Sequence, residues 1–160
     1  MTIAGATDAT GLVIFRLDDQ RYALELLRVE RVLPRVALTP FPKAPALVDG
    51  VFDFQGELVP AINLRRRFRW PERAPRLEDQ LLVVRTPRRR LALVIDAVEN
   101  VISVSAAELT APADIVPGLE FVRGVVRLPR EGIVFVHDLD QLLSLEEEAR
   151  LEAALDEAAR

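Results

Sequence analysis

The chain has 160 residues, half of them hydrophobic, and a formal net charge of −4. This length suits one domain or two small domains that share a core, and the hydrophobic fraction excludes wholesale disorder. Cysteine is absent, which excludes disulfides and thiolate chemistry, and without a long apolar run or a secretory signal the protein is expected to be cytoplasmic, with no direct membrane insertion.

The N-terminal third predicts a short tail followed by a β-hairpin. Residues 1–11 show no periodicity and are expected to form a flexible tail. Apolar residues then alternate from Val13 to Leu26 on either side of the turn sequence Asp18-Asp19-Gln20, which is typical of a hairpin. Residues 27–33 suit a short helix that Pro34 would end.

The stretch Gly50–Arg67 predicts a second hairpin followed by a short basic turn. Phe52 and Phe54 share one face of its first strand, because side chains in a strand alternate with period two. The dipeptide Gln55-Gly56 suits a two-residue turn, in which glycine takes a positive φ at low steric cost. Pro60 has no amide hydrogen, so the second strand should lie at a sheet edge or a bulge.

Both hairpins recur in the second half of the chain. Residues 12–33 match residues 81–102 without a gap, and Val48–Val51 matches Val122–Val125. Asn63-Leu64 then matches Asp138-Leu139 after one inserted residue. A single hairpin cannot bury its apolar face alone, so this repeat predicts two similar β-units.

The C-terminal segment predicts an acidic amphipathic helix over residues 144–160. Ser144 and Glu147 form a capping-box pattern, and Leu151 and Leu155 lie on one thin apolar stripe. Three interpretations remain open: a helix packed on the β-units, a helix presented to a partner, and an exposed terminal helix.

No catalytic constellation is visible in the sequence. The one histidine, His137, precedes Asp138, but its repeat counterpart is Ile62, which explains the position as a strand end. Phosphate-binding and nucleophile-elbow motifs are absent, and one histidine without cysteine cannot form a structural zinc site. The basic runs Arg65–Arg69 and Arg85–Arg90 lack interleaved aromatics, which favours charged strand ends over nucleic-acid binding. We therefore expect neither enzymatic activity nor a metal or other cofactor.

The order of these motifs resembles the CheW-like domain. The similarity rests on Leu-Val-Ile-Phe-Arg-Leu before Gln-Arg-Tyr-Ala-Leu, on Leu-Thr-Pro-x-Pro, and on Val-x-Gly-Val-Phe-x-Phe-x-Gly-Glu-Leu-Val-Pro-Ala-Ile-Asn-Leu. It implies a mainly β fold of two SH3-like five-stranded β-barrels around a shared core, plus a C-terminal helix. The implied boundaries are barrel one at about 12–68, a linker at 69–79, and barrel two at about 80–143.

The resemblance also implies an adaptor without catalytic activity or cofactors. Such an adaptor couples methyl-accepting chemoreceptor cytoplasmic tips to the regulatory domain of a CheA-type histidine kinase, in receptor arrays at the inner membrane. The positions carried over for the kinase contact are Val13, Leu26 and Val29. Those for the receptor contact are Gly50, Val51, Gln55, Gly56 and Arg31. Ordinary core packing remains an equal alternative for the first three residues, and a purely conformational role remains one for the two glycines.

Two positions depart from the usual pattern of this family. Gln55 stands where arginine is usual, and Arg31 stands where glutamate is common. Such changes alter local electrostatics, which chiefly set partner choice and association rate. An alternative is therefore a divergent CheW-like interaction module that has lost kinase coupling and binds another partner, through residues 144–160 for example.

Overall fold

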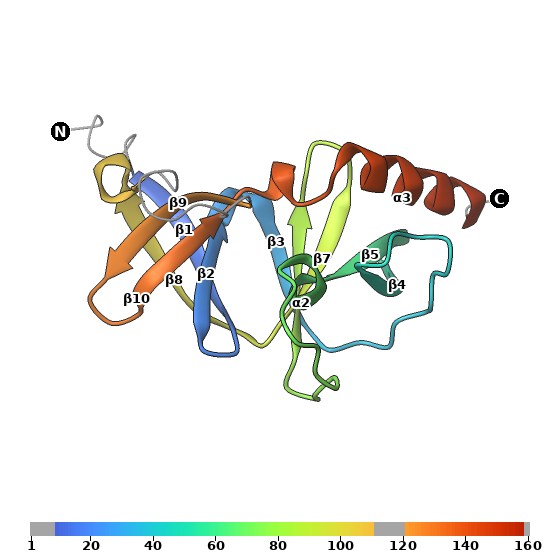
Figure 1. Ribbon diagram of the computed structural model, residues 1–160, viewed down its shortest axis with the longest axis horizontal. Helices are drawn as coiled ribbons and strands as arrows, with labels where there is room; N and C mark the ends of the chain where they lie inside the picture. Colours follow the sequence, from blue (N-terminus) through green and yellow to red (C-terminus); the bar gives the residue numbers. More distant parts are fainter. Residues whose placement is uncertain (1–8, 111–120, 159–160) are drawn as a thin grey trace. The chain divides into compact units, whose positions relative to one another are not determined.

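The computed structural model describes residues 9–110 and 121–158 (Figure 1). Its elements in chain order are β1 (Ala9–Leu17), β2 (Gln20–Glu25), the 3-10 helix η1 (Leu26–Arg28), β3 (Val29–Pro34), β4 (Val48–Phe54), β5 (Glu57–Asn63), α2 (Leu64–Arg67), β6 (Gln80–Arg85), β7 (Arg90–Ile95), β8 (Ala97–Ser105), η2 (Ala106–Glu108), β9 (Val122–Leu128), β10 (Gly132–His137), η4 (Leu139–Gln141) and α3 (Leu145–Ala158). The predicted mainly β fold with a C-terminal helix is confirmed.

The strands form two five-stranded sheets with the same internal order. Sheet A has the order β8-β1-β2-β10-β9, and sheet B has the order β3-β6-β7-β5-β4. Strands β1 to β5 of the first half correspond to β6 to β10 of the second half. The two sheets therefore have one topology, in which each sheet combines the first hairpin of one half with three strands of the other half.

The compact units follow this exchange rather than the order of the chain. Unit 1 consists of Met1–Val29 and Asp96–Gln141, and unit 2 consists of Glu30–Ile95 and Leu142–Arg160. This division differs from the expected consecutive barrels at 12–68 and 80–143. The reason lies in strand pairing: β3 pairs with β6 of the other half, and the parallel pairs β2–β10 and β5–β7 also join the halves. Sequence similarity identifies the repeat but does not specify which copy a strand will pair with.

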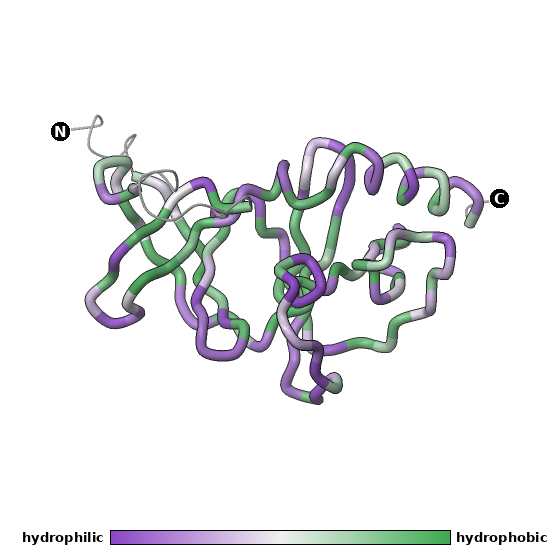
Figure 2. Tube along the Cα trace, viewed as in Figure 1, coloured by the Kyte–Doolittle hydropathy of each residue, from purple (hydrophilic) through white to green (hydrophobic). Residues whose placement is uncertain are grey.

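Each unit has its own apolar core, built at corresponding positions of the repeat. Figure 2 shows the strands as largely hydrophobic and the turns as hydrophilic. The core of unit 1 contains Leu12, Ile14, Ala23, Val104, Val126, Val134 and Val136. The core of unit 2 contains Phe52, Phe54, Val59, Leu81, Val83 and Ala92. The residues of β1 and β2 in the first core correspond one to one to those of β6 and β7 in the second core, so the duplication extends to side-chain packing.

The hairpin β4–β5 forms with the predicted turn. Phe54 pairs with Glu57, and both Gln55 (φ 54°) and Gly56 (φ 84°) have the positive φ angles of a two-residue turn. The expectation of an edge position for Pro60 is wrong, because β5 lies between β4 and β7, although a bulge lies close by in β4. Pro60 is tolerated because pairing with β7 starts only at the next residue, Ala61.

Residues 27–33 do not form the predicted helix. A single 3-10 turn, η1, is followed directly by β3, an edge strand of sheet B. The β-branched residues Val29 and Val32 favour a strand, and pairing with β6 provides hydrogen bonds that a short isolated helix lacks. Tertiary pairing therefore overrides the weak local helical pattern.

Helix α3 begins at the predicted capping box. The Ser144 hydroxyl accepts a hydrogen bond from the Glu147 amide (3.1 Å), and the Glu147 carboxylate accepts one from the Ser144 amide (2.8 Å). Leu151 and Ala154 are buried, and Glu147 pairs with Arg67 of α2 at 2.5 Å. Of the three interpretations of this segment, the structure supports a helix packed on a β-unit.

Candidate partner-binding surfaces

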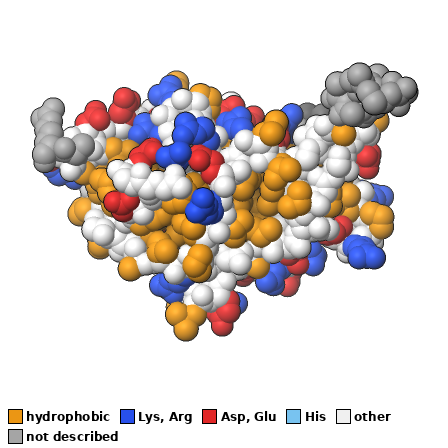
Figure 3. Space-filling model, turned by 180° about the vertical axis from the view of Figure 1, so that it is seen from behind, with side chains coloured by type: hydrophobic (Ala, Val, Ile, Leu, Met, Phe, Trp, Pro, Cys, Tyr) orange, Lys and Arg blue, Asp and Glu red, His pale blue; other side chains and the backbone are white. Residues whose placement is uncertain are grey.

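Three apolar side chains of unit 1 are exposed on η1 and β8, and we call this set, Leu26, Leu27 and Val101, the η1 patch. Their side chains are 42%, 95% and 52% exposed. Leu26 packs over Gly11 of β1, where an added Cβ would lie 3.1 Å from the Leu26 Cδ2 atom. Val13, two residues along β1, is paired with Val101 of β8, so Gly11, Val13 and Val101 share one face of sheet A. On the molecular face drawn in Figure 3, apolar side chains likewise reach the surface between charged ones.

The structure separates the three residues expected at the kinase contact. Leu26 is exposed, Val29 is half-buried, and Val13 is only 3% exposed, so Val13 now fits core packing better than direct contact. Sequence reasoning missed Leu27 and Val101. The repeat counterpart of Val101 is Val32, which the structure likewise shows exposed on an edge strand.

The tip of the β4–β5 hairpin is the exposed part of the expected receptor contact. Gln55 and Gly56 are both exposed, and the Asp53 carboxylate accepts a hydrogen bond from the Gly56 amide at 2.8 Å. This bond fixes the turn, so the tip presents a defined backbone conformation to solvent.

Gly50 and Val51 lie further from the tip, in the middle of β4, and are buried. Val51 exchanges two backbone hydrogen bonds with Thr39, at 2.8 and 2.9 Å. A Cβ added at Gly50 would lie 2.6 Å from the Thr39 carbonyl oxygen, which is too close for any side chain. Glycine is therefore needed at position 50 for close backbone approach, in agreement with the conformational alternative.

Arg31 lies beside the hairpin tip. Its guanidinium carbon lies 5.7 Å from the centroid of the Phe54 ring, and that of Arg90 lies 5.6 Å from the same centroid. Arg90 also pairs with Glu30 at 2.8 Å and with Glu57 at 2.6 Å. The hydrogen bond from Arg90 holds the pKa of the Glu30 carboxyl below its usual value. The structure thus places Arg31 against Phe54, the residue that precedes Gln55 in the chain.

Replacing Arg31 by glutamine should lower the free energy of unfolding by about 0.5–1 kcal/mol, the usual range for an exposed cation–π contact. Thermal unfolding followed by circular dichroism measures the change. Arg127→Gln, which removes an exposed arginine from β9, is the matched control and should change stability by less. Equal stability of the Arg31 variant and the parent would show that the stack contributes nothing.

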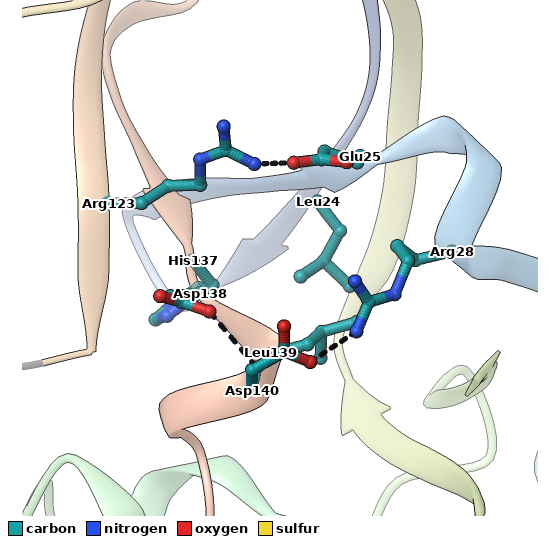
Figure 4. Close-up of a pocket in the computed structure, with 8 residues that line it drawn as sticks. All are labelled: Leu24, Glu25, Arg28, Arg123, His137, Asp138, Leu139 and Asp140. Carbon is teal, nitrogen blue, oxygen red and sulfur yellow. Dashed lines mark hydrogen bonds and ion pairs between the residues drawn. The ribbon is translucent and has the colours of Figure 1, made fainter. Parts of the chain in front are cut away.

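A charged pocket of about 230 Å³ lies within unit 1, at the end of β10 (Figure 4). Arg28 pairs with Asp140, and Arg123 pairs with Glu25. Both arginines are thus paired with carboxylates from other elements. The third carboxylate, that of Asp138, accepts a hydrogen bond from the Asp140 amide at 3.0 Å, so the lining carries one net negative charge (two minus three).

His137 lines the same pocket but is 5% exposed. Its ring centroid lies 4.6 Å from that of Tyr22, and its Nδ1 lies 3.3 Å from the Phe121 carbonyl oxygen. Burial lowers the pKa of His137 from 6.5 to about 4, so the ring is neutral near pH 7. Its environment is that of an aromatic core residue at a strand end.

The buried histidine should make stability depend on pH. Between pH 6.5 and about 4 the unfolded chain binds a proton that the folded chain excludes, so stability falls as the pH falls through this window. At about 1.4 kcal/mol per pKa unit the loss reaches about 3 kcal/mol. Denaturant unfolding of the parent and of His137→Phe at several pH values measures it: carboxylates titrate equally in both proteins, so their difference isolates the histidine. Parallel stability curves would contradict the burial argument.

Within residues 9–110 and 121–158, no group of three or more His, Cys, Asp or Glu residues is placed to hold a metal ion. Of the helices in the described part of the chain, none is long and apolar enough to cross a membrane.

Comparisons with known proteins point to one family. The model of the CheW-like domain matches residues 11–147. The chemotaxis protein CheW of Treponema pallidum is 30% identical over 146 residues, which cover 88% of this chain and 85% of the relative. The corresponding protein of Rhizobium meliloti is 29% identical over 138 residues, 85% of this chain and 88% of the relative. The crystal structure of the scaffolding protein TtCheW from Thermoanaerobacter tengcongensis has the same fold, with a TM-score of 0.78 and 23% identity over 86% of this chain and 94% of that chain.

Proposed function

Because this chain belongs to the CheW-like domain family, we propose that it is a non-catalytic adaptor that couples chemoreceptor tips to a CheA-type histidine kinase. The observation that carries the proposal is the match of the family model to residues 11–147, which includes all the strands of sheet A and sheet B except the first two residues of β1. The adaptor would act in the cytoplasm, within receptor arrays at the inner membrane.

The η1 patch is the proposed contact for the kinase regulatory domain. An apolar contact needs side chains that are exposed in the free protein and become buried in the complex. Leu26 and Leu27 meet this condition, and Val101 extends the same apolar surface onto the edge strand β8. Val13 and Val29 would support this surface from below and beside it.

The hairpin tip and Arg31 are the proposed contact for the receptor. Residue 31 lies against Phe54, the chain neighbour of residue 55. A glutamate at position 31 and an arginine at position 55, as in many family members, would together set the charge of this part of the surface. In this chain Arg31 replaces the acidic residue with a basic one, and Gln55 replaces the basic residue with a neutral one. Gly50 and Val51 would act through the fold of the hairpin.

The test is a binding assay with two purified partners, the kinase regulatory domain and a cytoplasmic receptor fragment from the same cell. We expect both to bind this protein, and to bind it together. Failure of the kinase domain to bind while another protein is captured specifically would favour the alternative of a divergent module without kinase coupling.

A second experiment addresses the two unusual residues. The double variant Arg31→Glu with Gln55→Arg restores the common family pattern, and we expect a higher affinity for the kinase domain or the receptor fragment. The single variants serve as controls, because each one introduces only half of the pair. Unchanged affinity of the double variant for both partners would count against a role of these positions in partner choice.

A further inference from the structure

Unit 2 contains a larger pocket, of about 570 Å³, that belongs to neither proposed contact surface. Four arginines line it, namely Arg35, Arg65, Arg66 and Arg73. Three carboxylates also line it, those of Asp49, Glu72 and Asp79, so the lining carries one net positive charge (four minus three). A planar guanidinium has five N–H donors, so an arginine that already pairs keeps donors for a ligand.

The wall of this pocket is fixed, although the sequence suggests a linker there. The sequence predicts residues 69–79 as a linker between the two barrels. Instead, Asp79 is 5% exposed and accepts hydrogen bonds from Arg73 at 2.6 and 3.1 Å and from the Arg76 amide at 2.9 Å. Arg66 pairs with Glu72 at 2.8 Å, which ties the same segment to α2. These bonds hold the wall in place before a ligand arrives, which lowers the entropy cost of binding.

The repeat allows this pocket to be compared with the one in unit 1. The unit 1 pocket of Figure 4 occupies the corresponding place, because its carboxylates Glu25, Asp138 and Asp140 correspond in the repeat to Val94, Asn63 and Arg65. All three of these counterparts line the unit 2 pocket. Both units thus have a pocket at this place, and three positions that are acidic in unit 1 are apolar, neutral or basic in unit 2, whereas Arg123 of unit 1 corresponds to the acidic Asp49.

Most of the remaining lining is apolar. It consists of Val36, Ala37, Leu38, Pro75, Leu77, Leu81 and Val94, together with the polar residues Asn63 and Gln80. Pockets of this size that combine an apolar wall with a few charged groups commonly hold small ligands. The arginine fork matches carboxylate and phosphate groups in shape and charge. We propose that this pocket binds a small organic anion, a carboxylate or phosphate carried on an apolar body.

The probe for this proposal is phenyl phosphate, titrated into the full chain and followed by amide NMR. We expect saturable one-to-one binding, with shifts concentrated in residues 36–38 and 72–81. Inorganic phosphate has the anionic group without the apolar body, and benzyl alcohol has the apolar body without the anionic group. Each should bind at least about tenfold more weakly than phenyl phosphate, a difference in binding free energy of about 1.4 kcal/mol. Arg35→Gln, at an exposed residue of the lining, should weaken phenyl phosphate binding by about tenfold, whereas Arg127→Gln on β9 should leave it unchanged.

Three results would overturn the proposal. Shifts that do not saturate, or that spread over the basic surface, would indicate general charge attraction only. Equal losses from Arg35→Gln and Arg127→Gln would lead to the same conclusion. Tighter binding of a glutamate-rich peptide at the same amides would identify the pocket as a contact for an acidic protein segment instead of a small-molecule site.

Discussion

Gly50→Ala should lower the free energy of unfolding by about 3 kcal/mol, a larger loss than we expect for alanine at Gly124, the counterpart of Gly50 in the repeat. The added Cβ would lie 2.6 Å from the Thr39 carbonyl oxygen and 3.0 Å from the Leu38 Cβ. Neither atom belongs to the flexible end of a side chain, so relief requires backbone movement. That movement would weaken the two Thr39–Val51 hydrogen bonds, worth about 1 kcal/mol each, in addition to the 1–3 kcal/mol typical of overpacking.

The repeat supplies a matched control, Gly124→Ala. There the added Cβ would meet the Leu109 Cδ2 at 3.0 Å, and the Thr110 carbonyl oxygen is 3.5 Å away. A leucine methyl group can rotate aside, so the loss should be no more than about 1 kcal/mol. Thermal unfolding should place the melting temperature of Gly50→Ala lower than that of Gly124→Ala by roughly 4–8 °C. Equal melting temperatures would show that the backbone contact at Thr39 is not rigid.

This result bears on how receptor binding by Gly50 variants is interpreted. If Gly50→Ala loses both stability and receptor binding, the glycine acts by shaping β4 and not by touching the receptor. Gln55 and Gly56 are exposed, so variants there can separate the two effects.

Leu27→Asp should weaken binding of the kinase regulatory domain by about 30-fold, or about 2 kcal/mol, because it places a charge in the proposed apolar contact. Leu27 is 95% exposed, so the substitution should leave the free energy of unfolding within about 0.5 kcal/mol of the parent. Isothermal titration calorimetry measures the affinity, and denaturant unfolding measures the stability.

Leu77→Asp is the matched control for this prediction. Leu77 is also almost fully exposed, at 89%, but it lies between α2 and β6 in unit 2. It should bind the kinase domain like the parent. If both aspartate variants bind equally well, the η1 patch is not the kinase contact, whereas equal losses would indicate a general effect of added negative charge.

Much of the local structure is predictable from the sequence. Period-two alternation identifies β4 and β5, the dipeptide Gln55-Gly56 identifies the turn, and Ser144 with Glu147 identifies the start of α3. These features depend on neighbours in the chain, where steric and hydrogen-bonding rules act directly. The repeat is also visible in the sequence, and the structure shows that corresponding residues of the two halves occupy corresponding positions in the two cores.

The exchange of strands between the halves is not predictable in this way. The apolar residues of 29–34 do not show whether this strand will extend its own hairpin or pair with β6, because either pairing would cover the same side chains. The burial of Val13 is also not predictable from the sequence. Alternation shows which residues share a face of the strand, but it does not show whether that face is covered. Leu27 was missed because a local pattern cannot show that an apolar side chain remains exposed.

Reconstitution tests whether this protein joins the receptor to the kinase. Receptor-bearing membranes, the purified kinase and this protein would be combined, and kinase autophosphorylation would be measured with and without the receptor's ligand. We expect the parent to raise kinase activity and to make it respond to the ligand. Leu27→Asp should do neither, whereas Leu77→Asp should behave like the parent. Kinase activity that is the same with and without this protein, although both partners are functional, would show that it does not couple receptor to kinase.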